Sequence, residues 1–291
     1  MKLTILSVHF YKAFKNECTA LLILVIGLLT TTDSLAQRVY GNTQQTAATS
    51  LGSVNNAGRV VDANYNNFST LNVTLSLLTT GIAQQNVRFT GALKPAPTSP
   101  LIIRFGSGSL LGIGNNTTIQ RTNGGINNTV GTAYTQQSLI DLINANSSSG
   151  ATEVSIPIPG ENIASDGLRL RISSALGVAL SARFYYVFFI APPILSTASL
   201  SVCDGSDGTL QITNFQSGYT YRLYDSLTGG NLIASGNTST LTFSVENLSS
   251  GTYYLEAVEG GTEFLSSRTA FNITVYPKPG NPEIEINNPI N

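Results

Sequence analysis

Three carboxylates are the first side chains in this sequence that could do chemistry. Glu153, Glu161 and Asp166 lie within one stretch and could in principle supply the acid and the base of a glycoside hydrolase. Such a pair must lie about 5–10 Å apart across a cleft. Nothing in the spacing brings these side chains together, and Asp166-Gly167 is typical of a turn. We therefore predict that the three acids are not catalytic and that the protein is not an enzyme.

A second group of oxygen-bearing side chains could bind a metal. Asp62 and Asn64 could supply oxygen ligands to a Ca²⁺ ion held in a loop, because hard cations prefer carboxylate and carbonyl groups. The alternative is that both side chains cap turns. The segment Asp204–Gly208 has part of a calcium-loop spacing but lacks the downstream Glu, so a hairpin corner is favoured. We predict no cofactor other than this candidate calcium.

Aromatic side chains form the third candidate group. A ring can stack on the apolar face of a sugar, and Tyr40, Tyr65 and Phe68 fall near one end of the first predicted module, with Tyr134 on a later loop. The alternative is that these rings belong to the core or to strand edges. We take Tyr65 and Phe68 as the candidate ligand-binding residues.

Other kinds of site are excluded by what the sequence lacks. The single His is His9 and one of the two Cys is Cys18, both inside the predicted leader; there is no Trp. The remaining chain then has one thiol, Cys203, and no imidazole. It has no intramolecular disulfide, no Cys/His zinc site and no Ser-His-Asp machinery.

The N-terminal segment, residues 1–36, is predicted to be a secretory signal peptide. Basic residues at Lys2, Lys12 and Lys15 precede an apolar run over residues 20–29, and Ser34-Leu35-Ala36 provides small residues for cleavage after Ala36. A membrane span needs about 20 apolar residues, so the run is short for one. The alternative is an uncleaved anchor.

The charge of the chain argues against nucleic acid as a partner. Charged residues make up 11% of the sequence, well below the roughly 25% of an average domain. Three of the 15 Lys and Arg and two of the 16 acids lie in the predicted leader, so the mature net charge is near −2. No basic patch is visible, and binding by phosphate neutralisation is not expected.

Residues 37–191 are predicted to form one β-sandwich module. In Leu71–Leu77, the Leu and Val residues fall on one face of the strand and the polar residues on the opposite face. In Leu168–Ile172, the apolar residues likewise fall on one face and the two Arg residues on the opposite face. This pattern indicates antiparallel sheets with one wet face. Further strands are predicted at Arg59–Asp62, Glu153–Ile158 and Val178–Ile190, and one short helix is predicted over residues 138–144.

A second all-β module is predicted over residues 197–276, after the double proline at Pro192-Pro193. Seven short strands separated by turn signals are typical of an immunoglobulin-like sandwich. Residues 277–291 are predicted to be a Pro-rich linker followed by the start of a further module, as in a fragment of a longer protein. The fold class is thus all-β, with two β-sandwich domains.

Short segments of the second module carry a resemblance over about 80 residues. They are Ser201–Gly205, Tyr219–Asp225, Thr228–Gly230, Gly251–Ala257, Ser267-Arg268 and Val275–Pro277. They resemble the immunoglobulin-like repeats of large secreted Bacteroidetes proteins associated with gliding motility and type IX secretion. Leu223 stands where that family usually has Trp, and a second Cys is missing, so no inter-sheet disulfide is implied. Tyr253 or Tyr254 is implied as the tyrosine corner.

The first module is similar to the N-terminal modules that precede such repeats. The segments that carry this are Val60–Asn64 with Ser69-Thr70, Asp166–Arg171 and Gly177–Ala182. The first of them also resembles galactose-binding-like jelly rolls of the discoidin type, without the Trp that closes their motif. The second resemblance implies a jelly-roll-like sandwich.

These observations favour an exported, non-catalytic protein of the cell surface that acts in adhesion or glycan contact. Its expected partners are surface glycans or other extracellular proteins, with no transmembrane span in the mature chain. Two alternatives remain: a structural stalk without a ligand, and an accessory region of a larger carbohydrate-active protein.

Overall fold

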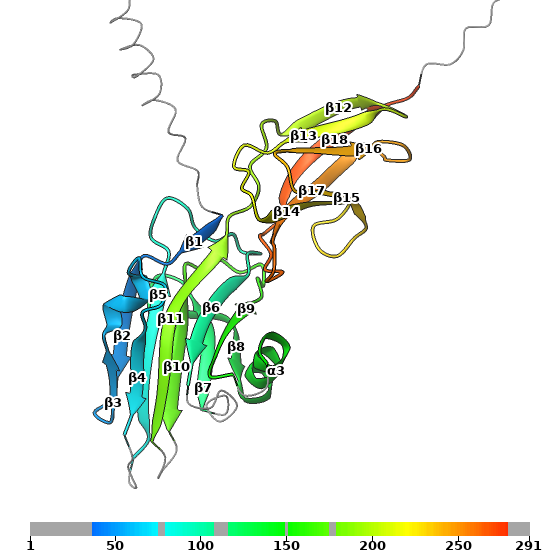
Figure 1. Ribbon diagram of the computed structural model, residues 1–291. Helices are drawn as coiled ribbons and strands as arrows, with labels where there is room; N and C mark the ends of the chain where they lie inside the picture. Colours follow the sequence, from blue (N-terminus) through cyan, green and yellow to red (C-terminus); the bar gives the residue numbers. More distant parts are fainter. Residues whose placement is uncertain (1–36, 75–78, 108–115, 149–150, 175–178, 279–291) are drawn as a thin grey trace, which may run out of the picture. The chain divides into compact units, whose positions relative to one another are not determined.

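Alternating apolar and polar residues form β-strands along most of the chain (Figure 1). The computed structural model describes residues 37–74, 79–107, 116–148, 151–174 and 179–278. The predicted signal peptide, 1–36, and residues 279–291 of the predicted linker lie outside the described residues. From Gln37 onward the chain forms one compact unit.

Two antiparallel sheets make up the N-terminal sandwich. The first has the order β3-β4-β11-β6-β9, with β1 also paired to β11. Its strands are β1 (Arg38–Tyr40), β3 (Gly52–Asn55), β4 (Ser69–Val73), β6 (Leu101–Gly106), β9 (Glu153–Ile158) and β11 (Leu180–Ile190).

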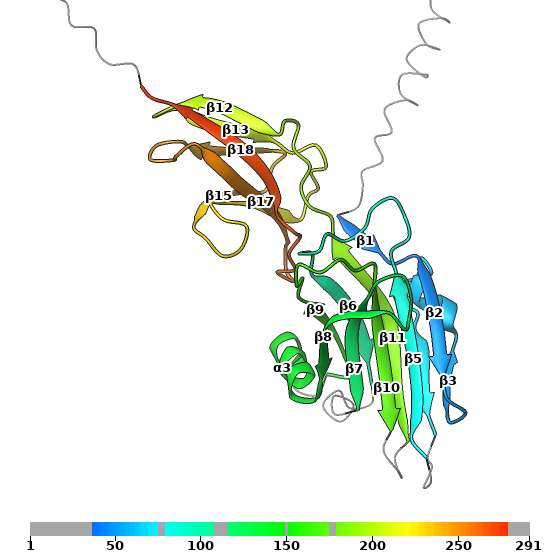
Figure 2. The same cartoon turned by 180° about the vertical axis from the view of Figure 1, so that it is seen from behind.

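The second sheet has the order β2-β5-β10-β7-β8, and Figures 1 and 2 show the sandwich from opposite sides. Its strands are β2 (Thr43–Ala48), β5 (Gly81–Arg88), β7 (Thr117–Thr122), β8 (Thr129–Thr135) and β10 (Gly167–Ser174). In β10, Leu168, Leu170 and Ile172 are fully buried while Arg169 and Arg171 are not, as the alternation predicts.

The core of this sandwich lies between the inner faces of the two sheets. It contains apolar residues of both, among them Leu71, Phe105, Leu170 and Phe184. Helix α3 (Gln136–Asn146) buries Leu139 and Ile143 against the same core. Its N-terminus is closed by a reciprocal capping box between Thr135 and Ser138, so the predicted helix exists and is longer than predicted.

The strand predicted at Arg59–Asp62 is wrong. This segment lies in a 3₁₀ helix, η1 (Ala57–Val61), which follows Asn56 in the left-handed region at φ 56°. Only Val60 is buried in it. The two adjacent valines suggested a strand, but the chain turns there and does not pair with a neighbouring strand.

The C-terminal sandwich has a five-stranded sheet of order β12-β18-β17-β14-β15 and a two-stranded sheet of β13 and β16. Strand β12 pairs with β18 in parallel, and the other pairs are antiparallel. The strands are β12 (Ser199–Cys203), β13 (Asp207–Gln211), β14 (Tyr219–Tyr224), β15 (Leu232–Gly236), β16 (Thr240–Ser244), β17 (Gly251–Glu259) and β18 (Thr269–Tyr276).

Two residues of this module decide points that the sequence left open. Leu223, in the position of the family's usual Trp, is fully buried in the core. Tyr253 is the tyrosine corner, because its hydroxyl donates to the backbone carbonyl of Ser249 at 2.7 Å. The all-β prediction with two sandwiches is confirmed. Among the described residues, no helix is long and apolar enough to cross a membrane.

Candidate functional site

A β-bulge in β11 gives the first sheet an aromatic outer face. The pairing of β11 with β6 shifts between Phe184 and Tyr186, so that the two consecutive residues Tyr185 and Tyr186 lie on the same side. Phe184 faces the sandwich core, whereas Tyr185, Tyr186 and Phe188 belong to a different buried cluster. The bulge therefore adds one more ring to the outer face than regular alternation would allow.

Rings from other segments pack on this face. Tyr40, from β1, stacks on Tyr65 with ring centroids 4.1 Å apart, and both rings meet the edge of Tyr186 at 5.5 and 5.9 Å. Phe68 packs against Tyr185 at 5.2 Å. Tyr65 remains 44% exposed, so its ring is available for contact with a ligand. The structure thus brings Tyr40, Tyr65 and Phe68 onto one surface.

The candidate calcium ligands hold the loop that carries two of these rings. Asp62 Oδ1 accepts from the backbone N–H of Asn64 at 2.9 Å, and Asp62 Oδ2 accepts from the amide of Asn67 at 3.0 Å. Asn64 Oδ1 accepts from the N–H of Asn66 at 3.1 Å. These are successive turns of the kind that Asp and Asn side chains stabilise. The described residues contain no cluster of three His, Cys, Asp or Glu that could hold a metal.

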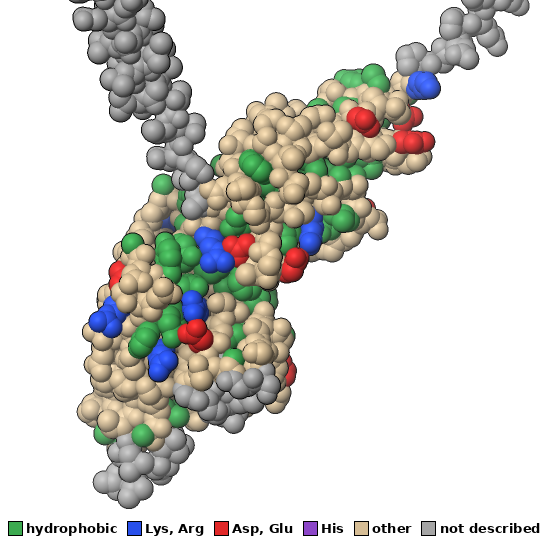
Figure 3. Space-filling view, viewed as in Figure 1, with side chains coloured by type: hydrophobic (Ala, Val, Ile, Leu, Met, Phe, Trp, Pro, Cys, Tyr) green, Lys and Arg blue, Asp and Glu red, His purple; other side chains and the backbone are tan. Residues whose placement is uncertain are grey.

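Three arginines lie over the aromatic face. The guanidinium carbon of Arg38 is 4.5 Å from the centroid of Phe188, that of Arg104 is 4.8 Å from Tyr185, and that of Arg183 is 5.2 Å from Phe68. These are cation–π distances. Figure 3 shows hydrophobic side chains interspersed with basic and acidic ones on this side of the sandwich.

The three acids that suggested hydrolysis have separate partners. Glu153 pairs with Arg104 at 2.5 Å, and Asp166 pairs with Arg88 at 2.6 Å. Glu161 accepts from the backbone N–H of Thr132 at 2.8 Å. The hydrogen bond from Tyr185, together with Arg104, lowers the pKa of Glu153.

Burial acts to raise the pKa of Asp166, but hydrogen bonds from Arg88 and the backbone of Gly124 outweigh it and hold that pKa below its usual range. A general acid needs a pKa raised toward the working pH. Both carboxyl groups are shifted in the opposite direction.

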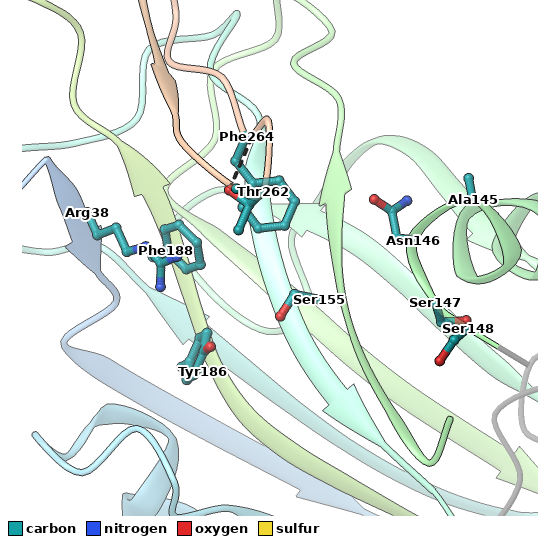
Figure 4. A pocket seen from close by; sticks show the side chains of 11 residues that line it. Arg38, Ala145, Asn146, Ser147, Ser148, Ser155, Tyr186, Phe188, Thr262 and Phe264 are labelled. Carbon is teal, nitrogen blue, oxygen red and sulfur yellow. Dashed lines mark hydrogen bonds between the residues drawn. The ribbon is translucent and has the colours of Figure 1, made fainter. Parts of the chain in front are cut away.

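A pocket of about 630 Å³ opens beside the aromatic face. One side is formed by Arg38, Ser155, Tyr186 and Phe188 of the first sheet (Figure 4). The end of α3 and the following residues, Ala145–Ser148, form a second side, and the loop after β17 closes a third with Gly261, Thr262 and Phe264. The lining thus combines aromatic rings with hydroxyl and amide groups.

The pocket lies where β1 meets the C-terminal sandwich. Arg38 donates to both oxygens of Glu259, Nε to Oε1 at 2.5 Å and Nη2 to Oε2 at 2.7 Å. Tyr219 and Thr262 donate to the same carboxylate at 3.1 and 2.6 Å.

Gln37 reinforces this junction. Only 1% of it is exposed, and its amide nitrogen donates to Tyr221 Oη at 2.9 Å and to the carbonyl of Asn214 at 3.1 Å. The apolar cluster that holds Phe188 also includes Tyr221, so the core of the C-terminal sandwich continues onto the aromatic face.

Sequence reasoning missed Tyr185, Tyr186, Phe188 and Arg38 as residues of this site; the three rings are largely buried beneath its surface. The run Phe184–Ile190 is apolar throughout, so its sequence does not show where the alternation breaks. Tyr134 does not join the group; it lies in β8, where its hydroxyl is 3.5 Å from Glu161.

A comparison with protein-family models identifies a match for the C-terminal module. The family model described as "Ig-like domain CHU_C associated" matches residues 191–277. No curated protein sequence matches the chain.

Three of the solved structures to which the chain is similar have the following identities and TM-scores. The β-1,2-glucanase of Parabacteroides distasonis is 15% identical at a TM-score of 0.38, over 82% of this chain and 38% of the glucanase. A low-affinity xylan-binding module from Roseburia intestinalis is 11% identical at 0.27, over 51% and 95% of the two chains. The K1 adhesin domain of Lys-gingipain from Porphyromonas gingivalis is 10% identical at 0.27, over 52% and 99%.

This chain spans well under half the length of the glucanase that it matches. The family match agrees with the strand order, the buried Leu223 and the Tyr253 corner seen in the structure. Residues 191–277 therefore form an immunoglobulin-like domain that matches the CHU_C-associated family model.

Proposed function

We propose that this protein is an exported, non-catalytic surface protein that contacts glycans through the aromatic outer face of its first sandwich. One observation carries the proposal: the bulge in β11 places Tyr185 and Tyr186 side by side among further rings, next to a pocket with polar walls. Sites for small ligands combine apolar surface with a few convergent polar groups.

The chemistry of the surface suits a sugar. The exposed ring of Tyr65 is braced from behind by Tyr40, so it can stack on the C–H face of a pyranose without losing much side-chain freedom. Hydroxyl and amide groups in the pocket can exchange hydrogen bonds with sugar hydroxyls. General-acid catalysis by Glu153 or Asp166 is not favoured, since both are ion-paired and have lowered pKa values.

A glycan array probed with the purified chain from Gln37 onward tests the proposal, followed by calorimetry on the best oligosaccharide. Tyr65→Ala is expected to weaken binding by about tenfold, since an aromatic contact contributes roughly 0.5–1.5 kcal/mol beyond area burial. Tyr276→Ala is the matched control, because Tyr276 is a comparably exposed ring, at 54%, on β18 of the other module. Equal binding by the two variants, or an empty array, would contradict the proposal.

A rigid spacer is the second candidate, and the junction between the modules favours it. Gln37 and Arg38 bind the immunoglobulin-like domain through Tyr221 and Glu259, contacts that would limit motion in a stalk. A spacer without a ligand predicts silence on every glycan, whereas glycan contact predicts binding that depends on Tyr65.

A further inference from the structure

We infer that the pocket takes an uncharged sugar unit and that the immunoglobulin-like domain supplies one of its walls. This inference rests on the proposed function, which it deepens by naming the ligand class and by making the second module part of the site. Its basis is the charge balance of the lining and the origin of the lining residues.

Charge is the first line of support. Arg38 is the one charged residue among those that line the pocket within the described chain. Its guanidinium is neutralised by the two-pronged contact with Glu259, and its remaining Nη1 faces Tyr40 Oη at 3.4 Å. The nearby Arg104 is paired with Glu153. A uronate or sulfate in the pocket would have to displace Glu259 from Arg38, leaving a buried carboxylate without its partner.

The uncharged polar groups are the second line of support. Asn146, Ser147, Ser148, Ser155 and Thr262 supply only hydroxyls and an amide. Figure 4 shows Ser155 between the aromatic side and the end of α3, and its side chain makes no hydrogen bond to the residues that the structure describes. Such groups satisfy sugar hydroxyls, which both donate and accept. A volume of about 630 Å³ falls within the range of small-ligand sites.

The second module contributes through the loop between β17 and β18. The ring centroids of Phe264 and Phe188 lie 6.1 Å apart across the junction, so rings from both modules line the pocket. Thr262 donates to Glu259, which ties this loop to the same carboxylate that neutralises Arg38. The ion pair between Arg38 and Glu259 therefore holds this loop in place and also neutralises the charge of Arg38 in the pocket.

The ligand class is tested by measuring the affinity of the protein for two oligosaccharides. They have the same sugar ring, which is uncharged in one and a uronate in the other. Wild type is expected to bind the uncharged form at least about tenfold more tightly. Glu259→Gln removes the negative charge that neutralises Arg38. The variant is therefore expected to bind the uronate form more tightly than wild type does, so that its affinities for the two forms differ less. Equal binding of both forms by wild type, or a preference for the uronate, would overturn the inference.

Blocking variants test the position of the site. Ser155→Phe fills the pocket from β9 and is expected to abolish the binding measured there, while Ser53→Phe, on β3 at the opposite edge of the same sheet, leaves it unchanged. Phe264→Ala is expected to weaken binding about tenfold, and its neighbour Leu265→Ala, whose side chain is exposed, is the control. Melting temperatures confirm that each variant is folded.

The outcomes distinguish failure of this inference from failure of the proposed function. Binding that depends on Tyr65 but not on Ser155 or Phe264 would refute the composite pocket and leave glycan contact standing. Binding of no glycan at all would refute the proposed function, and the inference with it.

Discussion

Arg38 in β1 and Glu259 at the end of β17 form a two-pronged ion pair, with both hydrogen bonds at or below 2.7 Å. The two residues are 221 positions apart in the sequence. Glu259 is 8% exposed, and the partly buried setting strengthens charge-assisted hydrogen bonds. The pair joins β1, the first strand of the N-terminal sandwich, to the end of β17 in the C-terminal sandwich, beside the pocket.

Removing this carboxylate is expected to destabilise the protein in a pH-dependent way. Burial acts to raise the pKa of Glu259, but hydrogen bonds from Arg38 and Thr262 outweigh it and hold that pKa below its usual range. Because the folded-state pKa is depressed, the stabilisation is complete above the unfolded value, near 4.3, and is lost as pH falls through the folded value.

Glu259→Gln should therefore lower the free energy of unfolding at pH 7 by about 1.5–3 kcal/mol, the range for hydrogen bonds to charged groups. The gap between wild type and variant should shrink as the pH falls below about 4. Urea unfolding at several pH values measures it. A gap that is independent of pH would show that the ionised carboxylate is not what stabilises the junction.

A second prediction concerns Arg121, a cation that is 1% exposed. It donates to the carbonyls of Pro159, Ser99 and Ile158 and to Ser165 Oγ, at 2.6–3.0 Å. Burial lowers its pKa to about 10, so it stays charged at pH 7, compensated by four oxygens in place of a carboxylate.

Lysine cannot reproduce this planar fork of donors. Arg121→Lys is expected to cost about 2–4 kcal/mol, because buried carbonyls lose their donors. Arg171→Lys, on the outward face of β10, is the matched control and should change stability by less than about 0.5 kcal/mol. Thermal and urea unfolding measure both. Similar losses in the two variants would contradict the role given to Arg121.

The regular strands of this protein could be predicted from its sequence. Strand β9 matches its predicted range, Glu153–Ile158, because one of its faces is buried and its side chains alternate. Strand β8 was not predicted, since none of its residues is fully buried and Gly131 interrupts any alternation.

The site was less predictable, for a physical reason. The side to which Tyr186 points depends on the shift in pairing between β11 and β6, and a single strand's sequence does not contain its partner's register. The pairing of Arg38 with Glu259 likewise arises only when the two modules meet. Tyr65 and Phe68 could be singled out because they are aromatic side chains near one end of the predicted first module, where a ring can stack on a sugar.

The tyrosine corner gives a third prediction, with its control in the next residue. The hydroxyl of Tyr253 donates to the carbonyl of Ser249, whereas the hydroxyl of Tyr254 makes no hydrogen bond to the described residues. Tyr253→Phe is expected to cost about 0.5–1.5 kcal/mol, and Tyr254→Phe close to nothing. Calorimetric melting of both variants decides between this account and one in which only the ring of Tyr253 matters.

The last prediction concerns Asp62, which the sequence offered as a calcium ligand. Both of its carboxylate oxygens already accept hydrogen bonds within the loop, from Asn64 and Asn67. We expect Asp62→Ala to weaken glycan binding several-fold by loosening the loop that presents Tyr65 and Phe68.

We also expect excess Ca²⁺ or a chelator to leave the melting temperature of wild type unchanged. A bound ion would instead stabilise the folded state by about 2.7 kcal/mol at a hundredfold excess over its dissociation constant. Asp141→Ala, on the exposed side of α3, is the control for the loss of one surface carboxylate. If Ca²⁺ raised the melting temperature of wild type but not of Asp62→Ala, the residue would be a metal ligand and the turn-capping account would be wrong.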